Sequence, residues 1–505
     1  MSQGVKRLFL VLVVFIIQVV LSLLTIIYFA NISLKIEILL RILGLIFVLI
    51  DLKSSKSTTK IIDNTFWIVL VIIIPILGVF SFIFVSNNFL RSKTVKKIRD
   101  NSEKQNKYLV QDENVLEEIE KLDDSVYSQF NYINKSGYPV YNNDKIDYFK
   151  NGESAFIKLK EDLLSAKKYI FMEYFIVNLG KMWNEILEIL VKKVTEGVEV
   201  KVIYDDVGSI NGLPDNYDKE LENLGIKCIS FNVVNHFFSA FLNNRDHRKI
   251  TVIDGIICYT GGINIGDEYI NHKERFGYWK DSVVRIEGEV TWNFTIAFLS
   301  MWKSIRKLSK PVLSYKPKYG KTNNDGYISL YCSNPLKKES VGENVYLNMI
   351  NQSKKSIYIL TPYLIIDNNL IKAFILAKKT GVDIKIVTPG VPDKKIVYDV
   401  TRSYYKNLLE NGIEIYEYSS GFLHSKVFLV DDKISTVGTI NLDYRSLDMH
   451  FECSSFIYKS KVIKDIKNDI DTILSVSRKI TIENTKTNFI KRLYLGFLRI
   501  FSTMM

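Results

Sequence analysis

Long apolar stretches dominate the first hundred positions of the chain. Residues 8–30 carry no charged side chain, and as a helix they would extend roughly 35 Å, enough to cross the hydrocarbon core of a bilayer. A second such stretch covers residues 67–85, with Pro75 near its middle as a candidate kink. Residues 38–50, between them, are apolar but short and contain Arg41. The pattern therefore predicts two or three membrane helices and leaves their number open.

A dense basic cluster follows the second apolar stretch, and it consists of Arg91, Lys93, Lys96, Lys97 and Arg99. Basic residues next to membrane helices favour the cytoplasmic side. We predict that residues 1–105 form a membrane anchor that ends in this juxtamembrane segment. The remainder of such a multi-pass membrane protein would then lie in the cytoplasm.

The other end of the chain, residues 477–505, has the periodicity of an amphipathic helix. Apolar residues recur every four positions, at Phe489, Leu493, Phe497 and Phe501. Lys491, Arg492 and Arg499 occupy other positions of the same turns. Such a helix either lies in an anionic lipid surface or docks on the protein's own core, and both interpretations stay open.

Between the two ends, short β-rich runs alternate with helical patterns, which indicates α/β layers around a sheet. Residues 106–148 look like a short, irregular lead-in. Strands at 169–175 and 197–206 flank a helix at 182–196, and strands at 357–363 and 381–390 flank a helix at 369–380. Gly197 and Gly381 end the two helices at equivalent places. We predict two duplicated α/β half-domains, a first half (residues 149–310) and a second half (residues 311–476), packed into one catalytic unit.

Composition restricts the possible partners and cofactors only in part. Lys and Arg number 67 against 55 Asp and Glu, a formal charge of +12, which favours an anionic partner such as nucleic acid, a membrane surface or a phosphorylated substrate. The four cysteines lie far apart with no Cys-x-x-Cys pair. We interpret them as reduced thiols and expect neither a metal site nor a cofactor.

Each copy of the module is followed by the same spaced motif. "HRKITVIDGIICYTGGIN" spans residues 247–264, and "HSKVFLVDDKISTVGTIN" spans residues 424–441. The shared residues lie at offsets 0, 2, 7, 14 and 17 and are His247, Lys249, Asp254, Gly261 and Asn264 in the first motif, and His424, Lys426, Asp431, Gly438 and Asn441 in the second. Two such matches among only five histidines make a chance origin untenable.

The spacing predicts a phosphate site. In a strand, residues two apart point to the same face, so each histidine and its lysine project together. The aspartate has an odd offset and falls in the following turn, where we expect it to act as a support. Lysine ammonium groups, asparagine amides and exposed backbone N–H groups bind phosphate oxygens. A histidine from each half, on opposite sides of one phosphate, suits in-line displacement in which one imidazole attacks and the other moves the proton.

These paired motifs resemble those of the phospholipase D superfamily, and within it the bacterial cardiolipin synthases. The resemblance extends over nearly the whole chain, including the hydrophobic N-terminal segment. It implies an enzyme that joins two phosphatidylglycerols into cardiolipin and releases glycerol, through a phosphatidyl-histidine intermediate and without a metal ion.

The resemblance also implies roles for single residues. His247 and His424 would be the nucleophile and the general acid/base, with His247 favoured as the nucleophile. Lys249, Lys426, Asn264 and Asn441 would hold the phosphate. An acidic residue downstream of each motif orients its histidine in the superfamily, which points to Glu452 for His424 and to Asp281 for His247. The remaining histidines, His236, His272 and His450, match no such spacing, and we expect ordinary surface or packing roles for them.

Other functions use the same residues. A membrane-anchored phospholipase D would pass the phosphatidyl group to water instead of an alcohol, and a nuclease would act on another phosphodiester. The predicted membrane helices and the tail argue against nucleic acid as a partner. A catalytically inactive lipid-binding protein is disfavoured because every motif residue is present.

Overall fold

The computed structural model describes residues 93–142, 144–232, 244–320, 325–337 and 339–500, together with isolated positions 42, 46, 71 and 502. The predicted membrane helices at 8–30, 38–50 and 67–85 lie outside the described residues apart from three of those isolated positions, and His236 lies outside them as well. Among the helices that are described, none combines the length and the apolar character needed to cross a bilayer.

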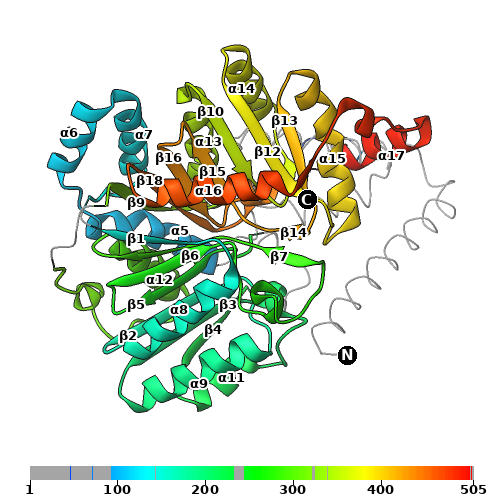
Figure 1. Cartoon of the computed structure of the whole chain (residues 1–505). Helices are drawn as coiled ribbons and strands as arrows, with labels where there is room; N and C mark the ends of the chain where they lie inside the picture. Colours follow the sequence, from blue (N-terminus) through cyan, green and yellow to red (C-terminus); the bar gives the residue numbers. More distant parts are fainter. Residues whose placement is uncertain are drawn as a thin grey trace.

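Two sheets form the centre of the molecule (Figure 1). The first sheet has the order β1 (Lys145–Phe149), β8 (Val283–Glu287), β6 (Ile257–Gly261), β5 (Lys249–Ile253), β2 (Tyr169–Tyr174), β3 (Glu199–Asp205), β4 (Lys227–Phe231). The second sheet has the order β9 (Tyr327–Ser333), β18 (Glu452–Tyr458), β16 (Ile434–Gly438), β15 (Val427–Val430), β10 (Ser356–Leu360), β12 (Asp383–Pro389), β13 (Glu414–Tyr418), β19 (Ser477–Lys479).

The two orders correspond strand by strand, and only β19 has no counterpart in the first sheet. In each sheet a strand pairs in parallel with the strand that follows a crossover helix, β2 with β3 and β10 with β12. The strand that carries the motif then pairs antiparallel with the first of these, β5 with β2 and β15 with β10. The duplication predicted from the sequence is therefore confirmed.

The crossover helices begin and end close to where the pattern places them. They are α9 (Lys181–Thr195) and α14 (Asn368–Lys379). Gly197 and Gly381 follow them with φ of +87° and +100°, in the left-handed region that a residue with a Cβ adopts only under strain. Each glycine thus reverses the chain from a helix into a buried parallel strand.

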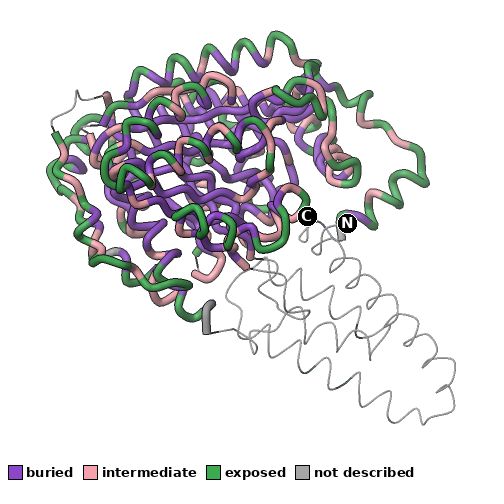
Figure 2. The backbone as a smooth tube through the Cα atoms, turned by 90° about the horizontal axis from the view of Figure 1, so that it is seen from below, coloured by how far each residue is buried: buried purple, intermediate pink, exposed green. Residues whose placement is uncertain are grey.

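Helices cover the outer faces of the sheets, and Figure 2 shows buried positions concentrated in the strands with exposed positions on the surrounding helices. The remaining described α-helices are α5 (Lys93–Lys104), α6 (Glu113–Leu122), α7 (Asp124–Lys135), α8 (Gly152–Ser165), α10 (Asp206–Ser209), α11 (Tyr217–Asn223), α12 (Thr291–Ile305), α13 (Val341–Gln352), α15 (Lys395–Glu410), α16 (Val462–Ser475) and α17 (Phe489–Ile500). Short helical turns are η2 (Gln105–Tyr108), η4 (Asp267–Ile270), η5 (Val312–Tyr315), the π-helical η6 (Arg445–Met449) and η7 (Ile482–Thr485).

The two halves also pair through short strands. β7 (Tyr278–Lys280) of the first half lies parallel to β14 (Gly421–Leu423) of the second, and an isolated parallel bridge joins Asp246 to Phe451. A further small pair is formed within the second half by β11 (Leu364–Ile365) and β17 (Leu442–Asp443). The inter-half pairings fix the register of one half against the other next to the motif residues His247 and His424.

The lead-in is not irregular, so that expectation was wrong. Residues 106–148 contain α6, α7 and the edge strand β1. Asp112 and Asp123 cap the two helices, because their carboxylates accept the N–H groups of Asn114 and Ser125, each at 3.1 Å. The apolar faces of both helices join the same core as the second sheet. The lead-in therefore packs against the core of the second sheet.

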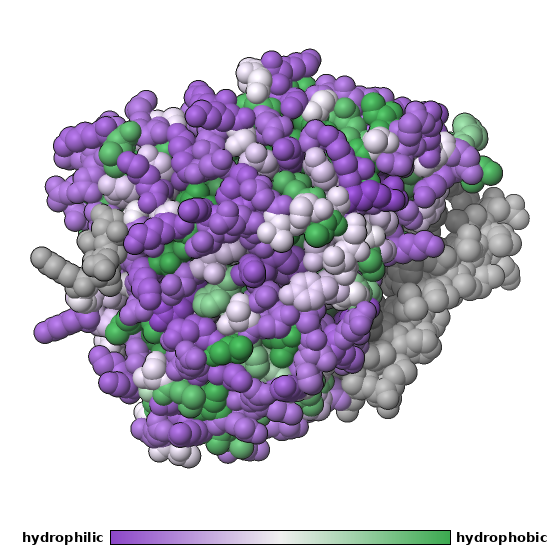
Figure 3. Space-filling view, in the orientation of Figure 1, coloured by the Kyte–Doolittle hydropathy of each residue, from purple (hydrophilic) through white to green (hydrophobic). Residues whose placement is uncertain are grey.

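The basic segment at 91–99 partly overlaps α5, which packs on α12 with Val95 and Ile98 buried. Lys96 and Lys97 are exposed on the opposite face. At the other end, α17 forms the predicted amphipathic helix and contacts α15. Figure 3 shows a largely hydrophilic face with hydrophobic side chains at the edge where α17 lies.

Candidate active site

Both motif histidines lie where one half of the chain pairs with the other. The N–H of His247 donates to the carbonyl of Phe451 at 2.9 Å, and the N–H of His424 donates to the carbonyl of Lys280 at 2.7 Å. Phe451 directly precedes Glu452, and Lys280 directly precedes Asp281. Each histidine is therefore placed next to an acid of the opposite half.

The acids bind the histidines across the halves. Nδ1 of His247 lies 2.9 and 3.0 Å from the two carboxylate oxygens of Glu452, and Nδ1 of His424 lies 2.8 Å from Oδ2 of Asp281. The sequence identified the two acids, but the expected pairing within each half was wrong. The acids bind the histidines of the opposite half because strands of the two halves pair with each other. The sequence of either half alone does not contain this pairing.

The residue after the motif glycine differs between the halves, and so does the support of the acid beside it. The hydroxyl of Thr439 donates to Glu452. At the equivalent position a Cβ on Gly262 would lie 1.9 Å from Oδ1 of Asp281, so a side chain there would displace that carboxylate. Asp281 instead accepts the N–H of Ser282 at 2.8 Å. The difference between Gly261-Gly262 and Gly438-Thr439 thus reflects two ways of holding an acid.

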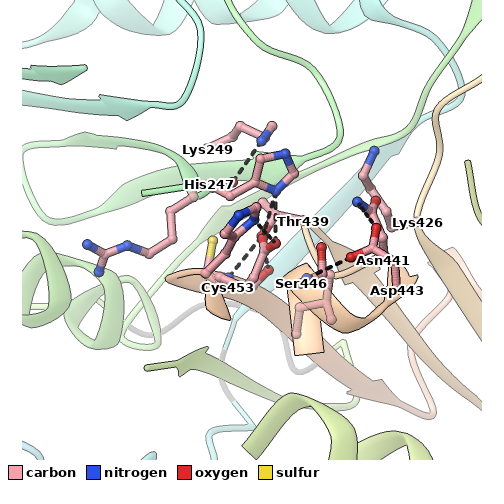
Figure 4. A network of polar contacts seen from close by, with 12 residues as sticks. His247, Lys249, Lys426, Thr439, Asn441, Asp443, Ser446 and Cys453 are labelled. Atoms are coloured by element: carbon pink, nitrogen blue, oxygen red, sulfur yellow. Dashed lines mark hydrogen bonds and ion pairs between the residues drawn. The ribbon is translucent and has the colours of Figure 1, made fainter. Parts of the chain in front are cut away.

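Lys249 and Lys426 converge on the same site from the two halves, and Figure 4 shows both beside His247. Each ammonium donates to the carbonyl of the histidine two residues earlier, at 2.7 Å for Lys249. Burial lowers the pKa of Lys249 to about 8. Burial, together with the charge of Lys249, lowers the pKa of Lys426 to about 7. Two crowded cations with depressed pKa values favour the binding of an anion.

The histidines are neutral for the same reason. Burial lowers the pKa of His424 to about 4, with the charge of Lys426 adding to the effect. Burial also lowers the pKa of His247 well below its usual value, and Lys249 and Lys426 act in the same direction. With Nδ1 held by a carboxylate, Nε2 of a neutral imidazole is the atom left for a substrate.

The acids differ from each other. Burial raises the pKa of Glu452 well above its usual value, although Lys249 opposes this. Burial also acts to raise the pKa of Asp281, but His424 and Lys426 outweigh it, so that pKa lies below its usual value. Asp281 is therefore the firmly ionised member of the two acids.

Asp254 and Asp431 lie in the turns after β5 and β15, as their odd offset predicts. Both have φ of 54°. Asp254 accepts the N–H groups of residues 167, 168 and 169 at 2.7–2.8 Å, and Asp431 accepts those of residues 354, 355 and 356 at 2.7–2.9 Å. These carboxylates therefore tie each motif strand to the start of its neighbour.

The remaining motif residues shape the loops beneath the histidines. A Cβ on Gly261 would lie 2.2 Å from the carbonyl oxygen of Ser282, and one on Gly438 would lie 2.5 Å from that of Cys453, so glycine permits the close approach of the strands. Asn264 donates to the Tyr269 hydroxyl at 2.9 Å.

Asn441 donates to Asp443 at 3.0 Å. Like Asn264, it therefore keeps a second amide hydrogen for another acceptor, because an NH₂ group has two donors.

The surroundings of the two histidines are unequal. The ring centroid of His424 lies 5.2 Å from Trp279, 5.8 Å from Tyr269 and 5.8 Å from Phe422. The ring of His247 instead lies 4.9 Å from Phe175 and 5.5 Å from His450. The surroundings of His424 are therefore aromatic, and those of His247 are more polar.

His450 is the main residue that the sequence analysis missed. It is 8% exposed, so of the surface and packing roles expected for it the surface role was wrong. Its Nδ1 lies 3.9 Å from Oε1 of Glu452. The available signal was its position two residues before Glu452, which puts both side chains on one face of an extended segment.

His247, His450 and Glu452 are, among the described residues, the group whose atoms could together hold a metal ion. Nitrogen and carboxylate donors suit zinc. The cations Lys249, Arg245 and Arg445 act on His450 from around it, and their charge opposes the binding of a divalent cation.

Comparison with known proteins gives the family. The family model described as "Cardiolipin synthase, PLD-like domain" matches residues 159–301 and 346–474, which are the two duplicated modules. The chain belongs to this family of phospholipase D-like proteins. It is 32% identical to a cardiolipin synthase of Alkalihalophilus pseudofirmus, over 90% of this chain and 90% of that protein.

Other relatives agree with this family. Cardiolipin synthase 1 of Staphylococcus aureus (strain COL) is 33% identical over 88% of this chain and 91% of that protein. An uncharacterized protein of Streptococcus mutans is 42% identical over 86% and 94%. The crystal structure of a phosphatidylserine synthase of Haemophilus influenzae Rd KW20 matches with a TM-score of 0.57 at 14% identity, covering 76% of this chain and 100% of that one. That last likeness shows the fold alone.

Proposed function

We propose that this protein is a cardiolipin synthase that transfers a phosphatidyl group from one phosphatidylglycerol to another and releases glycerol. The observation that carries the proposal is one buried site with two histidine–carboxylate pairs, each built from both halves, and a lysine from each half. Two imidazoles and two cations around one phosphodiester are what two successive in-line displacements need.

The phosphate of the donor lipid would bind to Lys249 and Lys426, with the second amide hydrogens of Asn264 and Asn441 as further donors. Two positive charges next to the phosphoryl oxygens offset the charge that develops there in each transition state. The aromatic rings beside His424 would contact the glyceride part of a lipid.

The reaction would proceed in two steps. Nε2 of one histidine attacks phosphorus while the other histidine, as its imidazolium, protonates the departing glycerol oxygen, giving a phosphatidyl-histidine and free glycerol. The anionic phosphate of the bound lipid would raise the pKa of this second histidine, because a nearby negative charge favours the charged imidazolium, which then takes up a proton before the step. The second histidine, now neutral, removes the proton from a hydroxyl of another phosphatidylglycerol, whose oxygen attacks phosphorus and frees the first imidazole. By likeness to the superfamily, His247 is the nucleophile and His424 the acid and base.

The acid of each pair serves its histidine in both steps. A carboxylate that accepts the Nδ1–H fixes the tautomer and stabilises the positive charge that the imidazole gains. Because His247 and His424 are only 9% and 8% exposed, water has restricted access to the phosphatidyl-histidine, which favours an alcohol as the acceptor. The alternative function is a membrane-anchored phospholipase D, in which water is the acceptor.

We further propose that the protein is a multi-pass protein of the bacterial cell membrane with its catalytic unit on the cytoplasmic side. The apolar residues of α17 support a membrane contact, since Phe489, Ile490 and Leu493 are 71%, 77% and 60% exposed. Its partners would be phosphatidylglycerol, as donor and acceptor, and the bilayer.

Purified protein supplied with phosphatidylglycerol alone tests the proposal. A synthase yields free glycerol and a tetra-acyl product in equal amounts, whereas a hydrolase yields phosphatidic acid. The variants His247→Ala and His424→Ala should form neither product while remaining membrane-bound. Phosphatidic acid as the main product would replace the proposed function by the alternative, and turnover by either variant would refute the two-histidine mechanism.

A further inference from the structure

The side chain of His450 is buried beside the reacting groups, and neither of its ring nitrogens has a hydrogen-bond partner among the residues that the structure describes. A buried polar group without a partner is destabilising, and a neutral imidazole carries one donor and one acceptor. A histidine placed in this way beside the reacting groups is suited to a partner that it acquires during the reaction.

Glu452 is the nearest group that can be this partner. Its Oε2 accepts from Thr439 and lies 3.0 Å from Nδ1 of His247. Its Oε1 lies 2.9 Å from the same nitrogen and has one lone pair left. Nδ1 of His450 lies 3.9 Å from Oε1, so an approach of under about 1 Å completes a hydrogen bond.

We propose that His450 is a positioning residue that donates a hydrogen bond to Oε1 of Glu452 when His247 becomes positively charged. The inference rests on the proposed function, because His247 gains that charge only in phosphatidyl transfer. The bond holds Glu452 as a carboxylate turned towards His247. In this role His450 touches neither substrate nor phosphorus.

The groups around His450 suit a neutral donor. Burial lowers the pKa of His450 well below its usual value, and the cations Arg445, Lys249, Arg245 and Lys394 act in the same direction. Besides these cations it faces Glu452 and the ring of His247. A neutral ring adds no charge to the site and still offers an N–H to the carboxylate.

Three variants test the role. His450→Phe keeps an aromatic ring without a donor, His450→Asn keeps an N–H donor that does not titrate, and His272→Phe changes an exposed histidine as a control. We expect His450→Phe to lower kcat about tenfold, the size of one hydrogen bond to a charged group, with KM for phosphatidylglycerol within twofold. His450→Asn should restore most of kcat, and His272→Phe should leave it unchanged.

The pH profile separates this role from packing. A hydrogen bond to a carboxylate favours its charged form, so its loss should move the acidic limb of kcat to higher pH in His450→Phe and not in His450→Asn. In the background of Glu452→Gln, the change at 450 should cost less than twofold, because the effect passes through that carboxylate.

The outcomes are distinct. An active wild-type enzyme with unchanged kcat and pH profile in His450→Phe overturns the inference and leaves the proposed function standing. Equal losses in His450→Phe and His450→Asn, or losses that multiply with Glu452→Gln, also overturn it. A wild-type protein without phosphatidyl transfer overturns both.

Discussion

The carboxylate of Glu452, in the second half, lies 2.9 Å from Nδ1 of His247, in the first half. The reciprocal contact joins Asp281 to His424 at 2.8 Å. Neither half therefore contains a complete histidine–acid pair, although each contains a complete sequence motif. The catalytic unit exists only when the two modules pack in this register, which makes the interface between them part of the chemistry.

A double-mutant cycle on stability checks this crossed pairing. We expect His247→Gln and Glu452→Gln to be coupled in the free energy of unfolding by about 1–3 kcal/mol, because contacting residues in one buried network do not act independently. His424→Gln combined with Glu452→Gln should be additive to within about 0.5 kcal/mol. The measurement is denaturant unfolding of the four proteins of each cycle.

Asp281 provides the matched control for that cycle. It should be coupled to His424 and independent of His247, the mirror image of the result for Glu452. Coupling of Glu452 to His424 instead would contradict the arrangement of the site described here.

The sequence was sufficient for features that are local or repeated. Period-two and helical patterns, with Gly197 and Gly381 at equivalent places, predicted both modules. The shared offsets identified the histidines, the lysines and the turn aspartates, because strand parity and a tight turn are properties of a few consecutive residues. The helices of the lead-in could also have been predicted from local sequence, because Asp112 and Asp123 are N-cap residues, but they were overlooked.

Other features depend on how distant segments pack. The pairing of Glu452 with His247 follows from strand register between the halves, which no spacing within one half contains. The same holds for the aromatic rings of Trp279, from the first half, and Phe422, from the second half, which both lie beside His424. His450 was missed because it does not follow the motif spacing. Its proximity to Glu452 becomes informative only once Glu452 is known to bind His247 of the opposite half.

The turn aspartates should matter for stability more than for turnover. Asp254 and Asp431 each accept three backbone N–H groups, and each such bond to a charged group contributes about 1.5–3 kcal/mol. We expect Asp254→Ala to lower the free energy of unfolding by about 3 kcal/mol or more. Activity per folded molecule should change less than tenfold, in contrast to His247→Ala.

Asp432, which follows Asp431 in the same turn, is the control for this prediction. Its change to Ala removes a carboxylate that has no such set of backbone donors among the described residues. Thermal unfolding and active-site-normalised rates separate the two effects. A loss of turnover in fully folded Asp254→Ala comparable to that of His247→Ala would assign the aspartate to the chemistry.

Binding of a phosphate-like anion should take up protons. The pKa values of Lys249 and Lys426 are about 8 and about 7, so near pH 8 a substantial fraction of these two lysine side chains is neutral. An anion between the two ammonium groups favours their charged forms and raises both pKa values. Proton uptake should therefore be largest between about pH 7 and pH 9 and should vanish below about pH 6, where both lysines are already charged.

Isothermal titration calorimetry with tungstate, in buffers of different ionisation enthalpy, measures this uptake. Lys426→Met should remove most of it and weaken binding at least tenfold. Lys372→Met, at an exposed lysine of α14, serves as the control and should change neither. Equal proton uptake in wild type and Lys426→Met would show that the depressed lysine is not part of the anion site.

The exposed apolar face of α17 should bind lipid. Arg499 stacks over the ring of Tyr404 of α15 at 4.5 Å, Lys491 lies 3.6 Å from Asp399, and Leu498 is buried, so the side of the helix that carries these three residues is the side that contacts the protein. Phe489 and Leu493 remain 71% and 60% exposed. A helix docked by its own core-facing stripe would have these two residues covered, so the structure favours the lipid interpretation.

Changing Phe489 and Leu493 together to Gln tests this contact. Removing two large apolar side chains from a lipid interface costs about 3 kcal/mol or more, so activity on phosphatidylglycerol vesicles should fall at least tenfold. Activity on detergent-dispersed phosphatidylglycerol should stay within twofold, because micelles bring the substrate to the site without that interface. A change of Ile482 to Gln, at an apolar residue 44% exposed in η7, is the control. Equal losses on vesicles and in detergent would mean that the helix stabilises the fold and does not bind the membrane.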